Sequence, residues 1–201
     1  MCMTTFTNAR TCPPVNYDLE GVRRTLADDG LVLMPTDTLW SVGCDARSIV
    51  AIKRQARLTG HREAPPAEVL IESIHMLKDY VKHLHPRLET LLHYHTRPLT
   101  FLLDPNHRLP ADLHGPDGLV AFRVAQDDFC CALLRSHGRP VAVRPAGDGQ
   151  GEMPATFGAI NSNIIEGVDH VVRYRQSDKS PGEESVMVQL SRKGELIFLR
   201  E

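Results

Sequence analysis

Short apolar runs alternate with amphipathic segments of helical period along most of the chain, and this alternation constrains the fold more than any other feature. The apolar runs have the length of buried strands and are bounded by turn residues. A sheet with helices packed on it satisfies both patterns, so we predict a mixed α/β fold. Strands are expected at residues 31–35, 67–73, 99–104, 119–124, 140–143, 170–174, 185–190 and 195–200, and helices at 17–29, 48–58, 74–81, 86–93, 126–136 and 157–166.

The chain length indicates a single folded domain. With 201 residues, of which 42% are hydrophobic and 24% charged, the chain can bury a substantial core. We assign this domain to residues 17–201. Residues 1–16 are polar and contain prolines, and we expect them to form an extended arm.

The composition also limits the compartment and the partners. The chain contains no apolar run of about 18 residues, so we expect no membrane span and no membrane partner. Its N-terminus lacks the apolar stretch of a signal peptide. Five cysteines with no CxxC pair favour reduced thiols and a cytoplasmic protein. The net charge of −2 gives no general preference for nucleic acid, although a local basic cleft is compatible with it.

The segment PTDTLWSVGCDA, residues 35–46, is the most distinctive motif. It directly follows an expected strand, and we expect it to be a loop. Thr36, Asp37 and Thr38 therefore lie at the carboxyl end of a strand, where α/β sheets usually bind ligands. The alternative is an Asx or ST turn in which the same side chains cap the next element.

Two further motifs have weaker chemical interpretations. The histidines of HLHPRLETLLHYH, residues 83–95, form i, i+2 pairs that do not share one helix face, so we predict no metal site. The loop PAGDGQGE, residues 145–152, has three glycines whose amides could cradle an anion. It lacks the spacing of a P-loop, and we favour a solvated loop. No pattern identifies a nucleophile or another catalytic residue.

Five segments resemble, in order and spacing, the motifs of the YrdC-type threonylcarbamoyl-AMP synthase family. PTDTLW with GCDA resembles the PTDTxYGxGxDA signature, RPLTFLL resembles the GPLT strand, and LVAFRV resembles an arginine-bearing strand. GVDHVVRYRQSD is similar to a late segment of bacterial members, and SVMVQL with ELIFLR is similar to the closing STV and near-terminal arginine motifs. The resemblance extends from about Gly21 to Arg200, and five ordered motifs are more specific than one.

The resemblance implies a single domain in which a twisted mixed sheet and helices surround a concave, positively charged cavity. It also implies an activity, since family members condense threonine, bicarbonate and ATP, usually with Mg²⁺, into threonylcarbamoyl-AMP for tRNA modification. Lysine and arginine are needed there because ATP and a carboxylated threonine bring several negative charges into one cavity. Some members are described as double-stranded RNA binders, so structured RNA is a further implied partner.

The family's substrate-binding positions match residues of this chain one by one. Trp40 stands where the family has a tyrosine, so an aromatic wall is kept without the phenol. Arg123 matches the strand arginine that meets the substrate carboxylate. Ser185 matches the serine of the STV motif. The positions implied to bind substrate are Thr36, Thr38, Trp40, Thr100, Arg123 and Ser185.

Several positions depart from the family pattern, and most of them concern the nucleotide. Arg62, Arg144 and Arg200 are the remaining arginines that we expect to bind it. Loss of two or three charge-assisted contacts, each worth roughly 1.5–3 kcal/mol, predicts ATP binding weakened by several orders of magnitude. The KxR motif falls on Thr59, Gly60 and His61, the next basic position on Pro65, the SAN motif on Pro145, Ala146 and Gly147, the STV threonine on Val186, and the YG glycine on Ser41.

We therefore predict a divergent family member with reduced or altered synthase activity, which uses ATP and Mg²⁺ if the activity is kept. Two alternatives belong to other functional classes. The first is a non-catalytic module that binds RNA or a nucleotide in the same cleft, with salt-sensitive binding and no ATP turnover. The second is a different acyl- or carbamoyl-transfer activity in the altered cavity.

Overall fold

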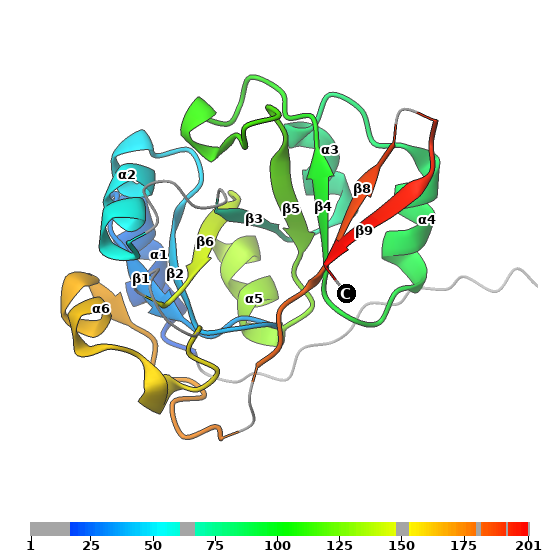
Figure 1. The fold of residues 1–201 in the computed structure, drawn as a ribbon. Coiled ribbons are helices and arrows are strands. Elements are labelled where there is room, and N and C mark those ends of the chain that lie inside the picture. Colours follow the sequence, from blue (N-terminus) through cyan, green and yellow to red (C-terminus); the bar gives the residue numbers. More distant parts are fainter. Residues whose placement is uncertain (1–16, 61–66, 148–152, 180–181, 192, 201) are drawn as a thin grey trace, which may run out of the picture.

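The computed structural model describes residues 17–60, 67–147, 153–179, 182–191 and 193–200. Nine strands of these residues form one twisted sheet in the order β7-β1-β2-β6-β3-β5-β4-β8-β9 (Figure 1). The pairs β1–β7, β3–β5 and β4–β8 are parallel and the others are antiparallel, which confirms the predicted mixed sheet. The strands are β1 Val32–Met34, β2 Ser41–Asp45, β3 Glu68–Ile71, β4 Leu99–Leu103, β5 Val120–Val124, β6 Val141–Pro145, β7 His170–Val171, β8 Val186–Leu190 and β9 Leu196–Arg200.

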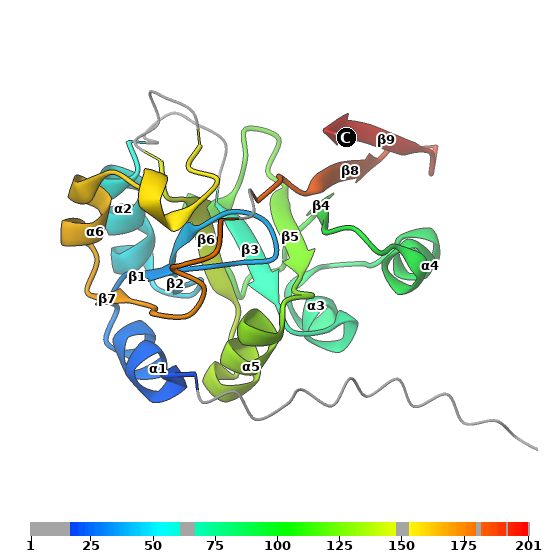
Figure 2. The ribbon, with the colours of Figure 1, turned by 90° about the horizontal axis from the view of Figure 1, so that it is seen from below.

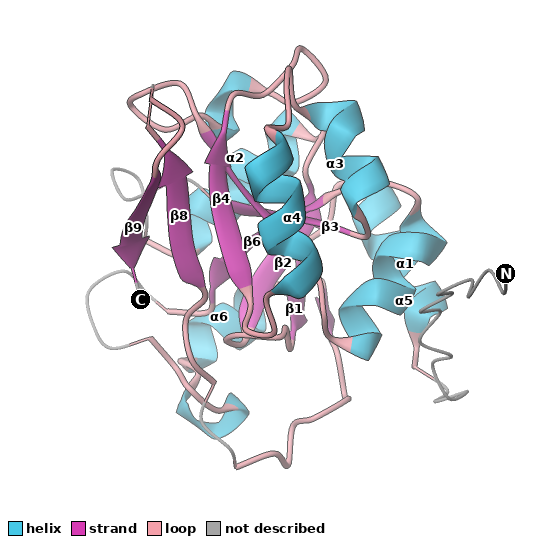
Figure 3. Ribbon diagram, turned by 90° about the vertical axis from the view of Figure 1, so that its right-hand side faces the viewer, coloured by secondary structure: helices cyan, strands magenta, loops and turns pink. Residues whose placement is uncertain are grey.

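Helices cover both faces of this sheet. In Figure 2, α1 and α5 lie side by side on one face and α2 lies on the other, while Figure 3 shows α4 beside β4. None of these helices has the length and apolar character needed to cross a lipid bilayer. The helices are α1 Leu19–Ala27, α2 Ile49–Leu58, α3 Ile74–Tyr80, α4 Pro86–Tyr94, α5 Asp128–His137 and α6 Ser162–Gly167, with short 3₁₀ helices at Ala111–Leu113 and Phe157–Ala159.

Side-chain caps explain where several helices begin. Ser48, the predicted N-cap, accepts a hydrogen bond from the Ala51 amide, which confirms the expected start of α2. Asp127 caps α5 in the same way through the Cys130 amide. Each such bond satisfies one of the amides that a helix leaves unpaired in its first turn.

The core consists of two apolar clusters on opposite faces of the sheet. The larger one includes Phe101 and Phe122 and is covered by α2, α3 and α4. The smaller one includes Phe129 and packs α1 and α5 against the sheet. Because β3, β5 and β6 lie between these clusters, both faces of the central strands are buried, as near-continuous apolar runs require.

Two sequence-based assignments are corrected by the structure. Residues 35–46 were expected to be one loop, but Ser41–Asp45 forms β2, which is completely buried between β1 and β6. Helix was expected at 157–166, but Asn161 is extended, and its side chain caps a shorter α6. Asparagine favours such a cap over a helix interior because its side chain competes for backbone amides.

Candidate functional site

The strand registers align residues of five neighbouring strands, β3, β5, β4, β8 and β9, on one face of the sheet. Leu70 is opposite Arg123, Arg123 is opposite Thr100, and Thr100 is opposite Met187, which is opposite Arg200. Directly opposed residues share a face, and so do residues two apart in one strand. Glu68, two residues before Leu70, therefore faces the same side as Arg123 and Arg200.

The Glu68 carboxylate is the centre of a polar network. Its Oε2 accepts a hydrogen bond from Arg123 Nε at 3.0 Å. Its Oε1 accepts from Arg200 Nη2 at 3.1 Å and from Ser185 Oγ at 3.3 Å. Burial raises the pKa of Glu68, although Arg200 and the Ser185 hydroxyl act in the opposite direction. The carboxylate thus links arginines from β5 and β9, two strands that are not adjacent.

Ser185 connects this network to the last strand. Its hydroxyl accepts from Arg200 Nη2 at 2.8 Å and lies 2.7 Å from Thr100 Oγ1. Arg200 Nε also donates to the Ser185 carbonyl at 2.7 Å, and its Nη1 donates to Glu184 at 3.0 Å. Charge-assisted contacts of this kind hold the Arg200 guanidinium in one orientation.

Arg123 is almost fully buried, with 1% of its side chain exposed, and is neutralised from two sides. Besides Glu68, it forms an ion pair with Asp37 of the first loop. Burial lowers the pKa of Arg123 to about 10, since the charged guanidinium loses its hydration. The second oxygen of Asp37 accepts a hydrogen bond from the Gln126 backbone N–H at 3.1 Å.

The first loop is held by its own hydroxyls. Thr36 Oγ1 donates to the Leu39 carbonyl at 2.8 Å, accepts from the Thr38 amide at 3.1 Å, and lies 3.0 Å from Thr38 Oγ1. Gly182 packs so closely on this loop that a Cβ there would lie 2.0 Å from the Thr38 carbonyl oxygen. The Thr36 hydroxyl thus makes the contacts of an ST turn within the loop, and its predicted role in substrate binding stays a prediction.

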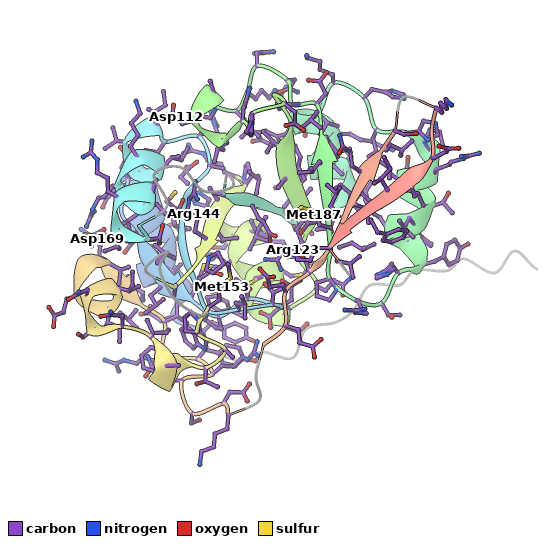
Figure 4. The ribbon with its side chains drawn as sticks, in the orientation of Figure 1. Asp112, Arg123, Arg144, Met153, Asp169 and Met187 are labelled. Atoms are coloured by element: carbon purple, nitrogen blue, oxygen red, sulfur yellow. The ribbon has the colours of Figure 1, made fainter. Side chains whose placement is uncertain are left out.

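A cavity of about 80 Å³ opens over this network, between the first loop, β6 and the start of β8. Figure 4 labels four of its lining residues, with Arg123 and Met187 toward β5 and β8 and with Arg144 and Met153 on the β6 side. Burial lowers the pKa of Arg144, which projects from β6. The lining residues are Thr38, Leu39, Ser41, Glu68, Arg123, Val143, Arg144, Pro145, Met153, Glu184, Ser185, Met187 and Arg200.

The charge of this cavity differs from the expectation. A positively charged hollow was expected, but among the described residues its three arginines face two glutamates, and Asp37 compensates Arg123 from behind. The described walls are therefore close to neutral. A neutral wall attracts a polyanion less strongly than an uncompensated arginine cluster does.

The predicted site residues fall into three groups. The cavity brings together Thr38, Arg123, Arg144, Ser185 and Arg200. The other described residues do not line this cavity: Thr36 is bonded within the first loop, Thr100 lies against Ser185, and Trp40 packs on Phe157, with ring centroids 4.9 Å apart. Arg62 and the loop residues 148–152 lie outside the described residues, so their predicted roles stay predictions.

Sequence reasoning missed Glu68 and gave no partner to Asp37. The available signal was a charge at the start of the apolar run AEVLI, where the neighbouring same-face positions are hydrophobic. A carboxylate in such a place is costly unless it is paired. A search for its partner on adjacent strands would have pointed to Arg123.

The described side chains do not form a resident magnesium site. No group of three or more histidine, cysteine or acidic side chains in this part of the chain is arranged to hold a metal ion. The two cavity glutamates, Glu68 and Glu184, are both engaged by Arg200. Mg²⁺ often binds proteins mainly through substrate phosphates, so the Mg²⁺ expected from the resemblance does not require such a group.

Comparisons with known proteins agree on one family. The family model Sua5_yciO_yrdC, described as telomere recombination, matches residues 24–201. A threonylcarbamoyl-AMP synthase of Xanthomonas euvesicatoria pv. vesicatoria is 28% identical over 159 residues, which is 77% of this chain and 84% of the relative.

Two solved structures have the same fold. P. abyssi Sua5 complexed with L-threonine superposes with a TM-score of 0.79 and 21% identity, over 90% of this chain and 53% of Sua5. The chain thus spans about half the length of that protein. E. coli YciO has a TM-score of 0.76 and 17% identity, over 91% of this chain and 88% of YciO. Identities of 21% and 17% show a common fold only, so the chemistry of this chain has to be argued from its own residues.

Proposed function

Since the chain belongs to the Sua5/YciO/YrdC family, we propose that it forms threonylcarbamoyl-AMP from threonine, bicarbonate and ATP in the cavity described above, at a reduced rate. The observation that carries this proposal is the convergence of Thr38, Arg123, Ser185 and Arg200 on one cavity. These residues come from the first loop, β5, the start of β8 and β9, and nothing in their sequence separation requires them to meet.

The cavity suits the amino-acid part of the reaction. Its volume of about 80 Å³ is well below the roughly 300–1,000 Å³ of pockets that enclose larger ligands, so the nucleotide has to extend outside it. In this proposal Ser185 and Arg200 present a hydroxyl and a guanidinium toward the threonine carboxylate. Arg200 thereby takes a role that the resemblance gave to Arg123, because Arg200 lies against Ser185 whereas Arg123 is 1% exposed. Arg144, on the opposite wall, is placed to face phosphate oxygens.

The proposed reaction joins two steps. The threonine amine and bicarbonate give a carbamate with loss of water, and a carbamate oxygen then attacks the α-phosphorus of ATP. The bond to the β-phosphate bridging oxygen breaks, and pyrophosphate leaves. Arg144, which faces the phosphates in this proposal, stabilises part of the negative charge that accumulates on the phosphate oxygens and the leaving group. The reduced rate follows from the altered KxR and SAN positions, which supply fewer contacts to phosphate.

Pyrophosphate release from Mg·ATP tests the proposal. The full chain should release pyrophosphate only with threonine and bicarbonate both present. Arg200→Met should lower kcat/KM by about 10–150-fold, the value of one charge-assisted contact. Arg23→Met removes an exposed arginine of α1 that lies outside the cavity and should change little. A rate equal to the blank without threonine would exclude the synthase reaction.

The rival prediction of a non-catalytic RNA-binding module has less support. RNA affinity depends on arginines and lysines whose charge is available to phosphates. In the cavity, Arg123 and Arg200 are compensated by carboxylates. The cytoplasm is the compartment that we propose for the synthase, because Cys44 and Cys130 are free thiols, as a reducing environment favours.

A further inference from the structure

Glu68 places a negative charge where the proposed reaction has to bind one. Its carboxylate lies between Arg123 and Arg200 and lines the cavity with about a fifth of its side chain exposed. Both oxygens are engaged, one by Arg123 and the other by Arg200 and Ser185. These are the interactions that a ligand carboxylate at this position would make.

The surrounding contacts show that this arrangement is built into the fold. Glu68 is the first residue of β3, and its backbone is fixed by pairing with Ala121 on one side and Val143 on the other. Thr100 supports the Ser185 hydroxyl from beneath. The position of the Glu68 side chain is therefore fixed by the sheet. Without a ligand, its carboxylate already binds the guanidinium groups of Arg123 and Arg200.

We propose that Glu68 is a specificity-determining residue that acts as an internal competitor for carboxylate ligands at Arg200 and Ser185. A ligand carboxylate binds only where it displaces the Glu68 side chain from these two partners. This inference rests on the proposed function for the identity of the ligand, which is the carboxylate of a small hydroxy-amino acid. It adds that the cavity selects against weakly bound anions.

Glu184 offers a matched comparison. It also pairs with Arg200, at 3.0 Å, but through the outer Nη1 nitrogen, and its side chain is 40% exposed. Removal of its charge changes the field at Arg200 without vacating the position between Arg123 and Arg200. Loss of charge alone should tighten carboxylate binding in both variants, and more weakly at the more exposed Glu184, whereas a ligand position is vacated only at Glu68.

The test measures binding of 3-hydroxybutyrate, which has the carboxylate and hydroxyl of threonine but no amine. Calorimetric titration at one pH and ionic strength compares the unmodified chain with Glu68→Gln and Glu184→Gln. Glu68→Gln should bind at least about tenfold more tightly, because one charge-assisted hydrogen bond regained corresponds to that factor or more. Glu184→Gln should change the affinity by less than about threefold, as expected for a partly screened charge.

A second variant keeps the result interpretable. Arg200→Met combined with Glu68→Gln should abolish the gain, which assigns it to this position. The inference is overturned if folded Glu68→Gln, checked by circular dichroism, binds the carboxylate no more tightly than the unmodified chain, or if Glu184→Gln gives an equal gain. Because no ATP is present, absence of pyrophosphate release would refute the proposed function and leave this measurement intact.

Discussion

Replacement of Arg123 by methionine should be among the most destabilising changes in the polar network. The Arg123 side chain is 1% exposed, and its guanidinium compensates the charge of Asp37, whose side chain is 7% exposed. Removal of one partner of a buried ion pair typically costs about 3–5 kcal/mol, because the other charge stays buried without compensation. Because Glu68 keeps Arg200 as a partner, its charge stays compensated, and we expect a loss of about 3 kcal/mol in the free energy of unfolding.

Urea unfolding followed by fluorescence provides the assay. Trp40 is the only tryptophan of the chain and is buried against Phe157, so its emission reports loss of the native packing. A loss of about 3 kcal/mol corresponds to a melting temperature lower by roughly 6–12 °C for a domain of this size. Unchanged m-values would show that the variant unfolds as the same cooperative unit.

Two further variants test the reasoning. Arg123→Met combined with Asp37→Asn should be more stable than Arg123→Met alone by about 1–2 kcal/mol, since no uncompensated Asp37 charge remains. Arg135→Met removes an arginine that is 56% exposed and paired with Glu72, and should cost less than about 1 kcal/mol. The predicted effect of an uncompensated Asp37 charge is contradicted if the double variant is no more stable than Arg123→Met alone. It is also contradicted if Arg123→Met and Arg135→Met lower the free energy of unfolding by the same amount.

Two other predictions concern the first loop and the pH dependence of stability. Gly182→Ala should lower the free energy of unfolding by about 1–3 kcal/mol and lower threonine-dependent pyrophosphate release, because the added Cβ meets a backbone carbonyl. Gly158→Ala, whose added Cβ has nothing within 4 Å, should change neither quantity. Equal effects of the two replacements in activity and melting assays would contradict the prediction. For Asp45, burial acts to raise the pKa. The nearby His137 ring, at 3.3 Å, and hydrogen bonds from the Arg47 backbone amide and Arg139 outweigh burial and hold the pKa below the ordinary value of 3.8. The carboxylate therefore adds stability above that pH and loses it as the pH falls through the lower folded value, so Asp45→Asn should be about 1–3 kcal/mol less stable at pH 7. That deficit should shrink below pH 4 in urea titrations, and a deficit constant down to pH 3 would contradict the assignment.

The elements that are visible in the sequence are those with strong local signals. The run LVLMP and the capping serine Ser48 both predict structure from their immediate neighbours, and both are found. The strand at Ser41–Asp45 was missed because its sequence SVGCD has weak strand propensity. It becomes a strand only because β1 and β6 supply backbone partners on both sides.

The candidate site shows the same division. Motif order alone selected Thr38, Arg123, Ser185 and Arg200, and these residues do line one cavity. The sequence could not show that Arg123 would be buried and paired with Asp37, nor that Glu68 would lie between two arginines. Strand register decides which side chains meet, and register is set by pairings between residues far apart in the chain.

By itself, the order of residues determined the class of fold, the family and the set of polar side chains available to the cavity. The pattern of apolar residues and the motifs are local properties, and they are read without coordinates. The balance of charge in the cavity was decided only by tertiary structure, because β3, β5 and β9 bring Glu68, Arg123 and Arg200 within hydrogen-bonding distance. Coulomb energy depends on the distances and the burial of these groups, and neither quantity is a property of the linear sequence.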